Sequence, residues 1–224
     1  MTEFLEKLIQ IIREFLEKQK EDRETPDENF EGQATIGIIV GHTKRSGGAS
    51  LNNQAYRNEY EYNSRVAEIA KSYADVNFSK NVTTHIIFRD FVGISGAYRK
   101  ANQLKCDVVV ELHFNAVANN TVTGTETLCT SHVGDKAYAR YMQDMQTKVF
   151  KRGNDSRGVK VLSRGARGFT NVSSFPLGYN CLVEPFFGSN LKDAKLAIDV
   201  QEEYAEGLIE ASVNFCKEHL GILK

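Results

Sequence analysis

Short apolar runs alternate with amphipathic segments along most of the chain. Runs rich in β-branched residues predict strands at 34–40, 82–88, 106–114, 123–131 and 180–186. Apolar residues at helical spacing predict helices at 61–75, 95–105 and 135–152, and one long final helix at 192–221. The Gly- and Ser-rich stretch 157–179 is predicted to be mostly loop. This alternation indicates an α/β fold: a doubly wound, largely parallel twisted sheet flanked by helices.

The first 23 residues form a separate pattern. Their apolar positions follow one broad helical stripe, with Glu, Lys and Arg opposite: Phe4, Leu5, Leu8, Ile9, Ile11, Ile12, Phe15 and Leu16. We expect an extra N-terminal amphipathic helix at 1–23, a charged linker at 24–33 and a catalytic domain at 34–224. The helix could dock on its own domain, pair with a second copy as a homo-oligomer, or lie on a membrane surface.

Composition narrows the classes of function. The 224 residues carry a formal net charge of −1, so no basic field for nucleic acid is expected. No segment has the roughly 20 apolar residues of a membrane span, so stable membrane insertion is not expected. Glu3, Glu6 and Lys7 interrupt the N-terminus, which therefore does not resemble a secretory signal. We expect synthesis in the cytoplasm, and four cysteines that are buried reduced thiols.

Three strand ends carry side chains suited to metal or acid–base chemistry. His42 follows the strand at 34–40, His113 lies near the end of 106–114, and Glu184 lies in the last strand. Ligands of doubly wound sheets bind beyond the carboxyl ends of the strands, so these three groups are expected to converge there. Two histidines and a carboxylate on one divalent ion, with a further carboxylate free, make a hydrolytic zinc site.

Each of these residues also has a structural explanation. A histidine after a strand is more often a satisfied loop residue than a ligand. Glu184, between Val183 and Pro185, could be half of a buried salt bridge. The carboxylate that completes the site could be Glu61 or its neighbour Glu59.

Seven short segments follow one another along the chain, and together they indicate a protein family more specifically than any one of them does alone. From about Ile36 to Phe215 the chain resembles the zinc-dependent N-acetylmuramoyl-L-alanine amidases of the amidase-3 type. The segments are GHTKRSGGAS, EYNSRVAEIA, FRD at 88–90, ANQLKCDVVVELHFNA, GTET, RGVKVLSR and CLVEPFFGSN.

The resemblance implies a set of roles. His42, Glu61 and His113 would hold one Zn²⁺ ion, and Glu184 would be the catalytic acid/base. Glu61 is favoured over Glu59 because an asparagine follows it two residues later, as the family pattern asks. Two further residues are implied to bind substrate: Asn115, and Arg164 through a peptide carboxylate.

The chain departs from the family pattern at several positions. Its glycine loop has a different sequence, Glu111 replaces a small polar residue, and Pro185 follows the catalytic glutamate. These departures affect substrate subtype more than zinc binding.

The expected function is hydrolysis of the amide bond between the lactyl group of N-acetylmuramic acid and L-alanine in peptidoglycan. The expected partners are thus the stem peptide and the glycan, met after release from the cytoplasm. A phage or prophage endolysin is the expected biological role. The alternatives are a sporulation or autolytic amidase, a non-catalytic peptidoglycan-binding module, and a zinc peptidase.

Overall fold

The computed structural model describes residues 32–52, 55–176 and 178–223. The predicted N-terminal helix and nearly all of the linker lie outside the described residues. Six strands in this part form one sheet with the order β2-β1-β3-β6-β4-β5. The strands are β1 (Ala34–Val40), β2 (Val82–Phe88), β3 (Val108–Leu112), β4 (Thr125–Cys129), β5 (Ser156–Val161) and β6 (Tyr179–Glu184).

The sheet is mixed rather than parallel throughout. β2, β1, β3 and β6 are parallel, whereas β4 pairs with β6 in the antiparallel sense and then with β5 in parallel. β5 also corrects the prediction of loop at 157–179. Its residues are partly or fully exposed at the sheet edge. An edge strand of this kind needs no apolar run, so it has no apolar signature in the sequence.

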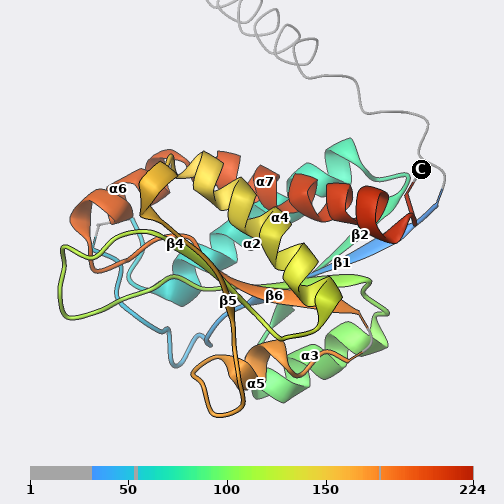
Figure 1. The fold of residues 1–224 in the computed structure, drawn as a ribbon, viewed down its shortest axis with the longest axis horizontal. Coiled ribbons are helices and arrows are strands. Elements are labelled where there is room, and N and C mark those ends of the chain that lie inside the picture. The colour runs from blue at the N-terminus through green and yellow to red at the C-terminus, as the bar shows by residue number, and fades with distance from the viewer. Residues whose placement is uncertain (1–31, 53–54, 177, 224) are drawn as a thin grey trace, which may run out of the picture. The chain divides into compact units, whose positions relative to one another are not determined.

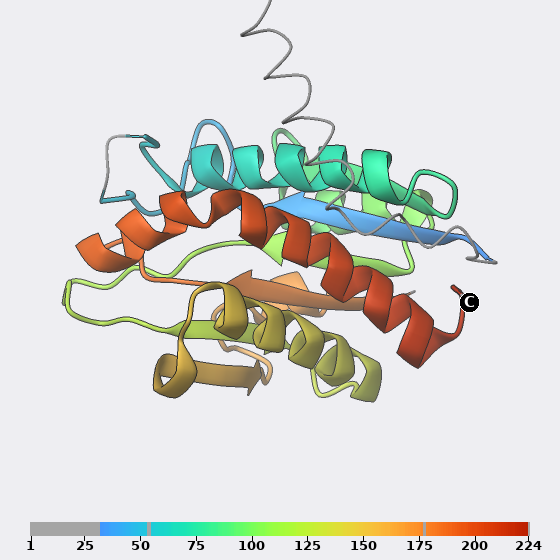
Figure 2. The same ribbon diagram turned by 90° about the horizontal axis from the view of Figure 1, so that it is seen from above.

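Helices cover both faces of the sheet. On one face lie α2 (Glu59–Asn77), α4 (Val133–Val149) and α7 (Gln201–Phe215), and on the other lie α3 (Gly93–Gln103) and α5 (Phe169–Val172) (Figure 1). Figure 2 shows α7 between α2 and α4, and it contacts both. None of the described helices is long and apolar enough to cross a membrane.

The last predicted helix is two helices and a short extension. α6 (Leu191–Asp199) has Val200 as its C-cap, and α7 follows directly. A π-helical turn, η2 (Cys216–Leu220), comes next and has Gly221, with φ 63°, as its C-cap. The predicted end of the helical segment at residue 221 is thus confirmed. A 3-10 turn, η1 (Gly153–Asp155), precedes β5. α3 begins at Gly93, two residues before the predicted start of this helix at 95.

The core lies on both sides of the central strands. β3 is buried along its whole length, and β1 is buried at every position but Thr35. On the α3 side, Ile39 and Val109 pack with Tyr98 and Phe175. Full burial of one such aliphatic side chain contributes about 1.5–3 kcal/mol, which fixes the positions of these strands. All four cysteines are buried and free, as expected.

The register of the central strands determines where the polar residues emerge. Val40 of β1 pairs with Leu112 of β3, and Leu112 pairs with Val183 of β6. The next residues along these three adjacent strands are therefore brought to one edge of the sheet. This edge carries the candidate functional residues.

Candidate metal centre

Two histidines lie side by side at this edge. His42 is two residues beyond β1, and His113 is the first residue after β3. Their ring centroids are 4.9 Å apart, with the rings at 72° to each other. His42 has φ 63°, in the left-handed region that non-glycine residues seldom adopt. Such backbone strain is found mainly where a side chain must be aimed at a functional site.

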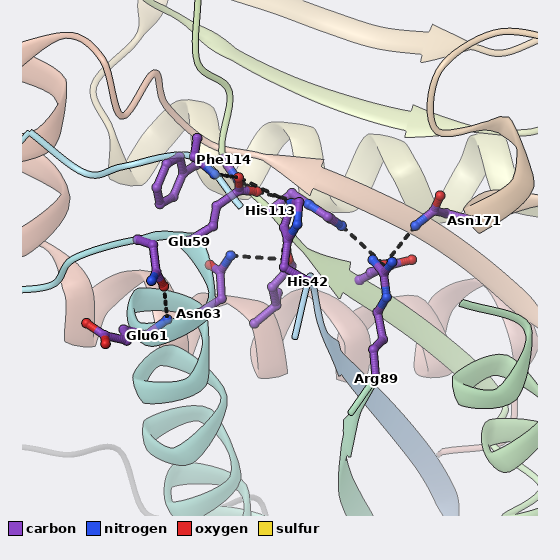
Figure 3. Close-up of polar contacts among 12 residues, drawn as sticks. His42, Glu59, Glu61, Asn63, Arg89, His113, Phe114 and Asn171 are labelled. Atoms are coloured by element: carbon purple, nitrogen blue, oxygen red, sulfur yellow. Dashed lines mark hydrogen bonds and ion pairs between the residues drawn. The ribbon is translucent and has the colours of Figure 1, made fainter. Parts of the chain in front are cut away.

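A buried carboxylate lies between the two rings. Glu59 is 4% exposed, and its Oε1 is 2.9 Å from Nδ1 of His113. Its Oε2 is 3.3 Å from Nε2 of His42. The backbone N–H groups of Phe114 and Ala49 donate to the same carboxylate, at 3.1 Å and 2.9 Å. Four groups from two segments, the loop after β1 and the residues after β3, thus hold Glu59 in place; Figure 3 shows Glu59 beside His113 and Phe114.

His42, Glu59 and His113 fit a zinc ion. One ligand atom from each can be chosen so that all lie within 4.8 Å of one another. Imidazole nitrogen and carboxylate oxygen are ligands that zinc prefers, and three protein ligands are typical of catalytic sites. The carboxylate's fixed position also lowers the entropy cost of binding an ion.

The charges in this group are strongly coupled. Burial raises the pKa of Glu59, but hydrogen bonds and charge from His113 and His42 lower it below its usual range. Burial lowers the pKa of His113, but hydrogen bonds to Glu111 and Glu59 and the charges of both raise it to about 10. A cation is therefore favoured at this position, whether it is a proton or a metal ion.

Glu61 is not part of this group, which corrects its assignment as a ligand. Its carboxylate binds Arg57, accepting from the backbone N–H at 2.9 Å and from Nε at 2.7 Å. Figure 3 shows its side chain directed away from the histidines. The reason is helical geometry: Glu59 and Asn63 are four residues apart on one face of α2, and a residue midway between them points elsewhere. Asn63 donates to the Leu112 carbonyl at 3.2 Å, so this face packs on β3.

Glu184 lines the same cleft as the three-residue group. A cavity of about 280 Å³ is lined by His42, Glu59, His113 and Glu184, among others. Burial and the charges of Glu59 and Glu126 raise the pKa of Glu184, while His113 and Arg167 lower it, and the result is about 7. A carboxyl group with such a pKa can both accept and donate a proton near neutral pH.

Comparison with known proteins supports a hydrolase of the cell wall. The family model of N-acetylmuramoyl-L-alanine amidases matches residues 36–213. The chain belongs to this amidase family. It is thus an N-acetylmuramoyl-L-alanine amidase, a hydrolase that degrades peptidoglycan, and its three-residue group is consistent with the metal site typical of the family. No curated protein matched the sequence.

Solved structures of similar fold include several amidases. The catalytic domain of the CD27L endolysin, which targets Clostridia difficile, is 27% identical, with TM-score 0.63, and the match covers 81% of this chain and 98% of that one. An N-acetylmuramoyl-L-alanine amidase from Clostridium difficile 630 is 21% identical, with TM-score 0.71 and coverages of 84% and 100%. The catalytic domain of CwlV from Bacillus (Paenibacillus) polymyxa var. colistinus is also 21% identical, with TM-score 0.69 and coverages of 83% and 99%.

The two predicted substrate-binding residues of this amidase lie in different surroundings. Asn115 lines the cleft and donates to Glu126 at 2.7 Å. Arg164 is exposed in the loop after β5 and is not among the residues that line the cleft. Arg167, three residues later, lines it together with Lys160. The family resemblance indicated Arg164, but Arg167 lies in the same Gly-rich run, so the local sequence does not separate the two.

Two glycines explain part of the loop between β1 and α2. A Cβ on Gly48, where φ is 80°, would lie 2.6 Å from Oε2 of Glu59 and 2.6 Å from Cδ2 of His42. A Cβ on Gly41 would lie 2.3 Å from the Leu112 carbonyl oxygen and 2.7 Å from the His113 ring. Both positions need glycine because the backbone passes directly against the side chains of the candidate metal site. The altered glycine loop of this chain therefore still encloses the site.

Proposed function

We propose that this amidase uses one zinc ion, held by His42, Glu59 and His113, and that Glu184 is its catalytic acid/base. The bond cleaved joins the lactyl group of N-acetylmuramic acid to L-alanine of the stem peptide. One observation carries the proposal. Glu184 is not one of the three candidate ligands, yet it lines the same cavity as His42, Glu59 and His113.

The chemistry divides between the ion and the chain. A zinc ion held by His42, Glu59 and His113 would act as a Lewis acid, which would polarise the scissile carbonyl and lower the pKa of an attacking water. Glu184 accepts a proton from that water and passes it to the leaving amine nitrogen of L-alanine. The pKa of Glu184 is about 7 in the metal-free protein, and a bound cation would lower it, which favours the carboxylate that accepts the proton near neutral pH. A second cavity of about 530 Å³ shares His42, His113 and Glu184 with the first. Lys160 and Arg167 line this larger cavity, where they attract the carboxylates of the stem peptide.

The direct test is product analysis on purified peptidoglycan. The zinc-loaded enzyme should release new N-terminal alanine together with a glycan that bears free lactyl carboxylates. Glu184→Gln should keep its zinc and lose at least about 100-fold in rate. Release of any other amino terminus would indicate a peptidase, and zinc binding without product would indicate a binding module. Full activity of the Glu184→Gln variant would remove Glu184 from its role.

We infer that the biological role is that of a phage or prophage endolysin, which leaves the cytoplasm through a separate membrane pore and acts on the wall. Similarity to an endolysin catalytic domain supports this role. The enzyme should be produced in a bacterium whose wall it cleaves, with and without a pore-forming protein. Lysis only with the pore fits an endolysin, whereas wall cleavage without it fits an autolytic or sporulation amidase.

The N-terminal segment is proposed to form a homo-oligomer that increases avidity for the wall. Light scattering on the full chain and on a chain lacking residues 1–23 tests this proposal. A similar oligomeric state in both proteins would contradict it.

A further inference from the structure

Glu111 is an ionisable side chain inside an apolar strand. It lies between Val110 and Leu112 in β3 and is 0% exposed. Burying a carboxylate is costly unless donors compensate it. Glu111 also lies two residues before His113, so successive pleats place both side chains on one face of the strand.

Four donors from four segments converge on this carboxylate. Its Oε1 accepts from Arg89 at 2.9 Å, from Asn171 at 2.8 Å and from Nε2 of His113 at 3.1 Å. Its Oε2 accepts from the Tyr98 hydroxyl at 2.8 Å. Figure 3 shows the side chains of Arg89 and Asn171 extending toward each other from separate elements. The position of the carboxylate is therefore fixed independently of the histidine.

The contact between Glu111 and His113 determines which nitrogen of the imidazole ring carries a proton. An ionised carboxylate only accepts hydrogen bonds, so Nε2 of His113 must carry the proton that it shares with Glu111. The other ring nitrogen, Nδ1, faces the carboxylate of Glu59 at 2.9 Å. Glu59 is itself a proposed zinc ligand, so an ion can replace the proton that Nδ1 shares with Glu59, while the proton on Nε2 stays with Glu111.

We propose that Glu111 is a positioning residue for the metal centre, which holds His113 in the orientation and tautomer that present Nδ1 to zinc. The proposal rests on the proposed zinc site. Histidine ligands commonly donate their second N–H to a carboxylate, and loss of that partner typically lowers metal affinity 10- to 100-fold. Arg89 pairs with the same carboxylate, so Glu111 does this without adding net negative charge to the cleft.

A competing explanation is that Glu111 only anchors Arg89 and Asn171 in the cleft wall. The two explanations differ in zinc binding. An anchor of the wall affects substrate binding but leaves the zinc ligands unchanged. A positioning residue changes zinc affinity and the state of the His113 ring, before any substrate is present.

The experiment compares the full-length chain with three variants. Zinc affinity is measured by competition with a chelator, and the His113 ring by ¹⁵N NMR of the zinc-loaded protein. Glu111→Ala removes the acceptor. Glu111→Gln keeps an oxygen for His113, because its amide can donate to the Tyr98 hydroxyl. Tyr98→Phe is the matched control: it removes a different hydrogen bond from the same carboxylate.

We expect Glu111→Ala to bind zinc about 10- to 100-fold more weakly. We expect Glu111→Gln to recover most of this loss, and Tyr98→Phe to bind zinc within about threefold of the unaltered chain. The unaltered protein should show zinc on Nδ1 of His113 and an exchange-protected proton on Nε2.

Coordination through Nε2 in the unaltered chain would overturn the proposal, even if Glu111→Ala does not fold. So would unchanged zinc affinity in Glu111→Ala, or an equal loss in Tyr98→Phe. If the unaltered chain binds no zinc at all, the proposed metal site itself fails, which distinguishes the two failures.

Discussion

Glu184→Gln should stabilise the metal-free protein in a way that depends on pH. The Glu184 pKa rises from its ordinary value of 4.5 to about 7, chiefly because the side chain is buried. The native state therefore holds this proton more tightly than the unfolded chain does. The resulting stabilisation is fully present below pH 4.5 and is lost as pH rises through about 7. Glutamine resembles the protonated carboxyl group and has no proton to lose.

The magnitude follows from the size of the shift. One pKa unit corresponds to about 1.4 kcal/mol, so a shift from 4.5 to about 7 costs the ionised native state roughly 3 kcal/mol at pH 8. At pH 5 the corresponding cost is about 1 kcal/mol. The unfolding free energy of Glu184→Gln minus that of the unaltered chain should thus increase by about 2 kcal/mol from pH 5 to pH 8. Such a gain is a large fraction of a typical domain's stability.

Urea unfolding of chelator-treated protein at pH 5, 6, 7 and 8 measures this difference. Glu61→Gln is the control, because that carboxylate is bound to Arg57 outside the metal centre and its pKa is lowered rather than raised. Zinc should reduce the stability that Glu184→Gln gains over the unaltered chain, because a nearby cation favours the ionised carboxylate of Glu184. A stability difference between Glu184→Gln and the unaltered chain that stays flat from pH 5 to 8 would refute the reasoning.

Three further predictions concern the metal centre. Glu59→Gln should weaken zinc binding more than about 100-fold, whereas Glu61→Gln should change it less than about threefold; calorimetric titration that ranks them the other way would restore Glu61 as the ligand. Gly48→Ala should lower zinc affinity and cost about 1–3 kcal/mol, because its Cβ meets His42 and Glu59. Gly158→Ala has a similar φ of 74° but open space around its Cβ, so equal zinc affinities in the two alanine variants would contradict this. Zinc at about 100 times its Kd should raise the unfolding free energy by about 2.7 kcal/mol, and a thermal melt that zinc leaves unchanged would be inconsistent with the site.

The convergence of His42, His113 and Glu184 could be predicted from sequence. Each residue ends an apolar run, and apolar runs of this kind form adjacent parallel strands whose carboxyl ends share one edge. The structure confirms this through the register of β1, β3 and β6. The mixed character of the sheet could not be predicted, because neither β4 nor β5 carries a signal for its direction.

The choice between Glu59 and Glu61 could not be made from the family resemblance alone; it also required the geometry of the helix. A spacing of two residues to the following asparagine favoured Glu61. On a helix, residues two apart point in different directions, while residues four apart share a face. Asn63 packs against β3, so the acid that reaches the histidines is the one four residues before it. The rule was available from the sequence once the helix start was placed at Asn58, whose side chain caps it by accepting from the Glu61 backbone N–H.

Glu111 shows the opposite case, in which a sequence feature was visible but its meaning was not. A carboxylate inside an apolar strand indicates that donors must be nearby, because burial without them is too costly. Those donors come from the residue after β3, from α3, from α5 and from the residue after β2, so they are scattered along the sequence from Arg89 to Asn171. Only their meeting in space identifies His113 as one of them. Since the same histidine nitrogen cannot serve both a carboxylate and an ion, the departure at Glu111 constrains the metal centre as much as the substrate cleft.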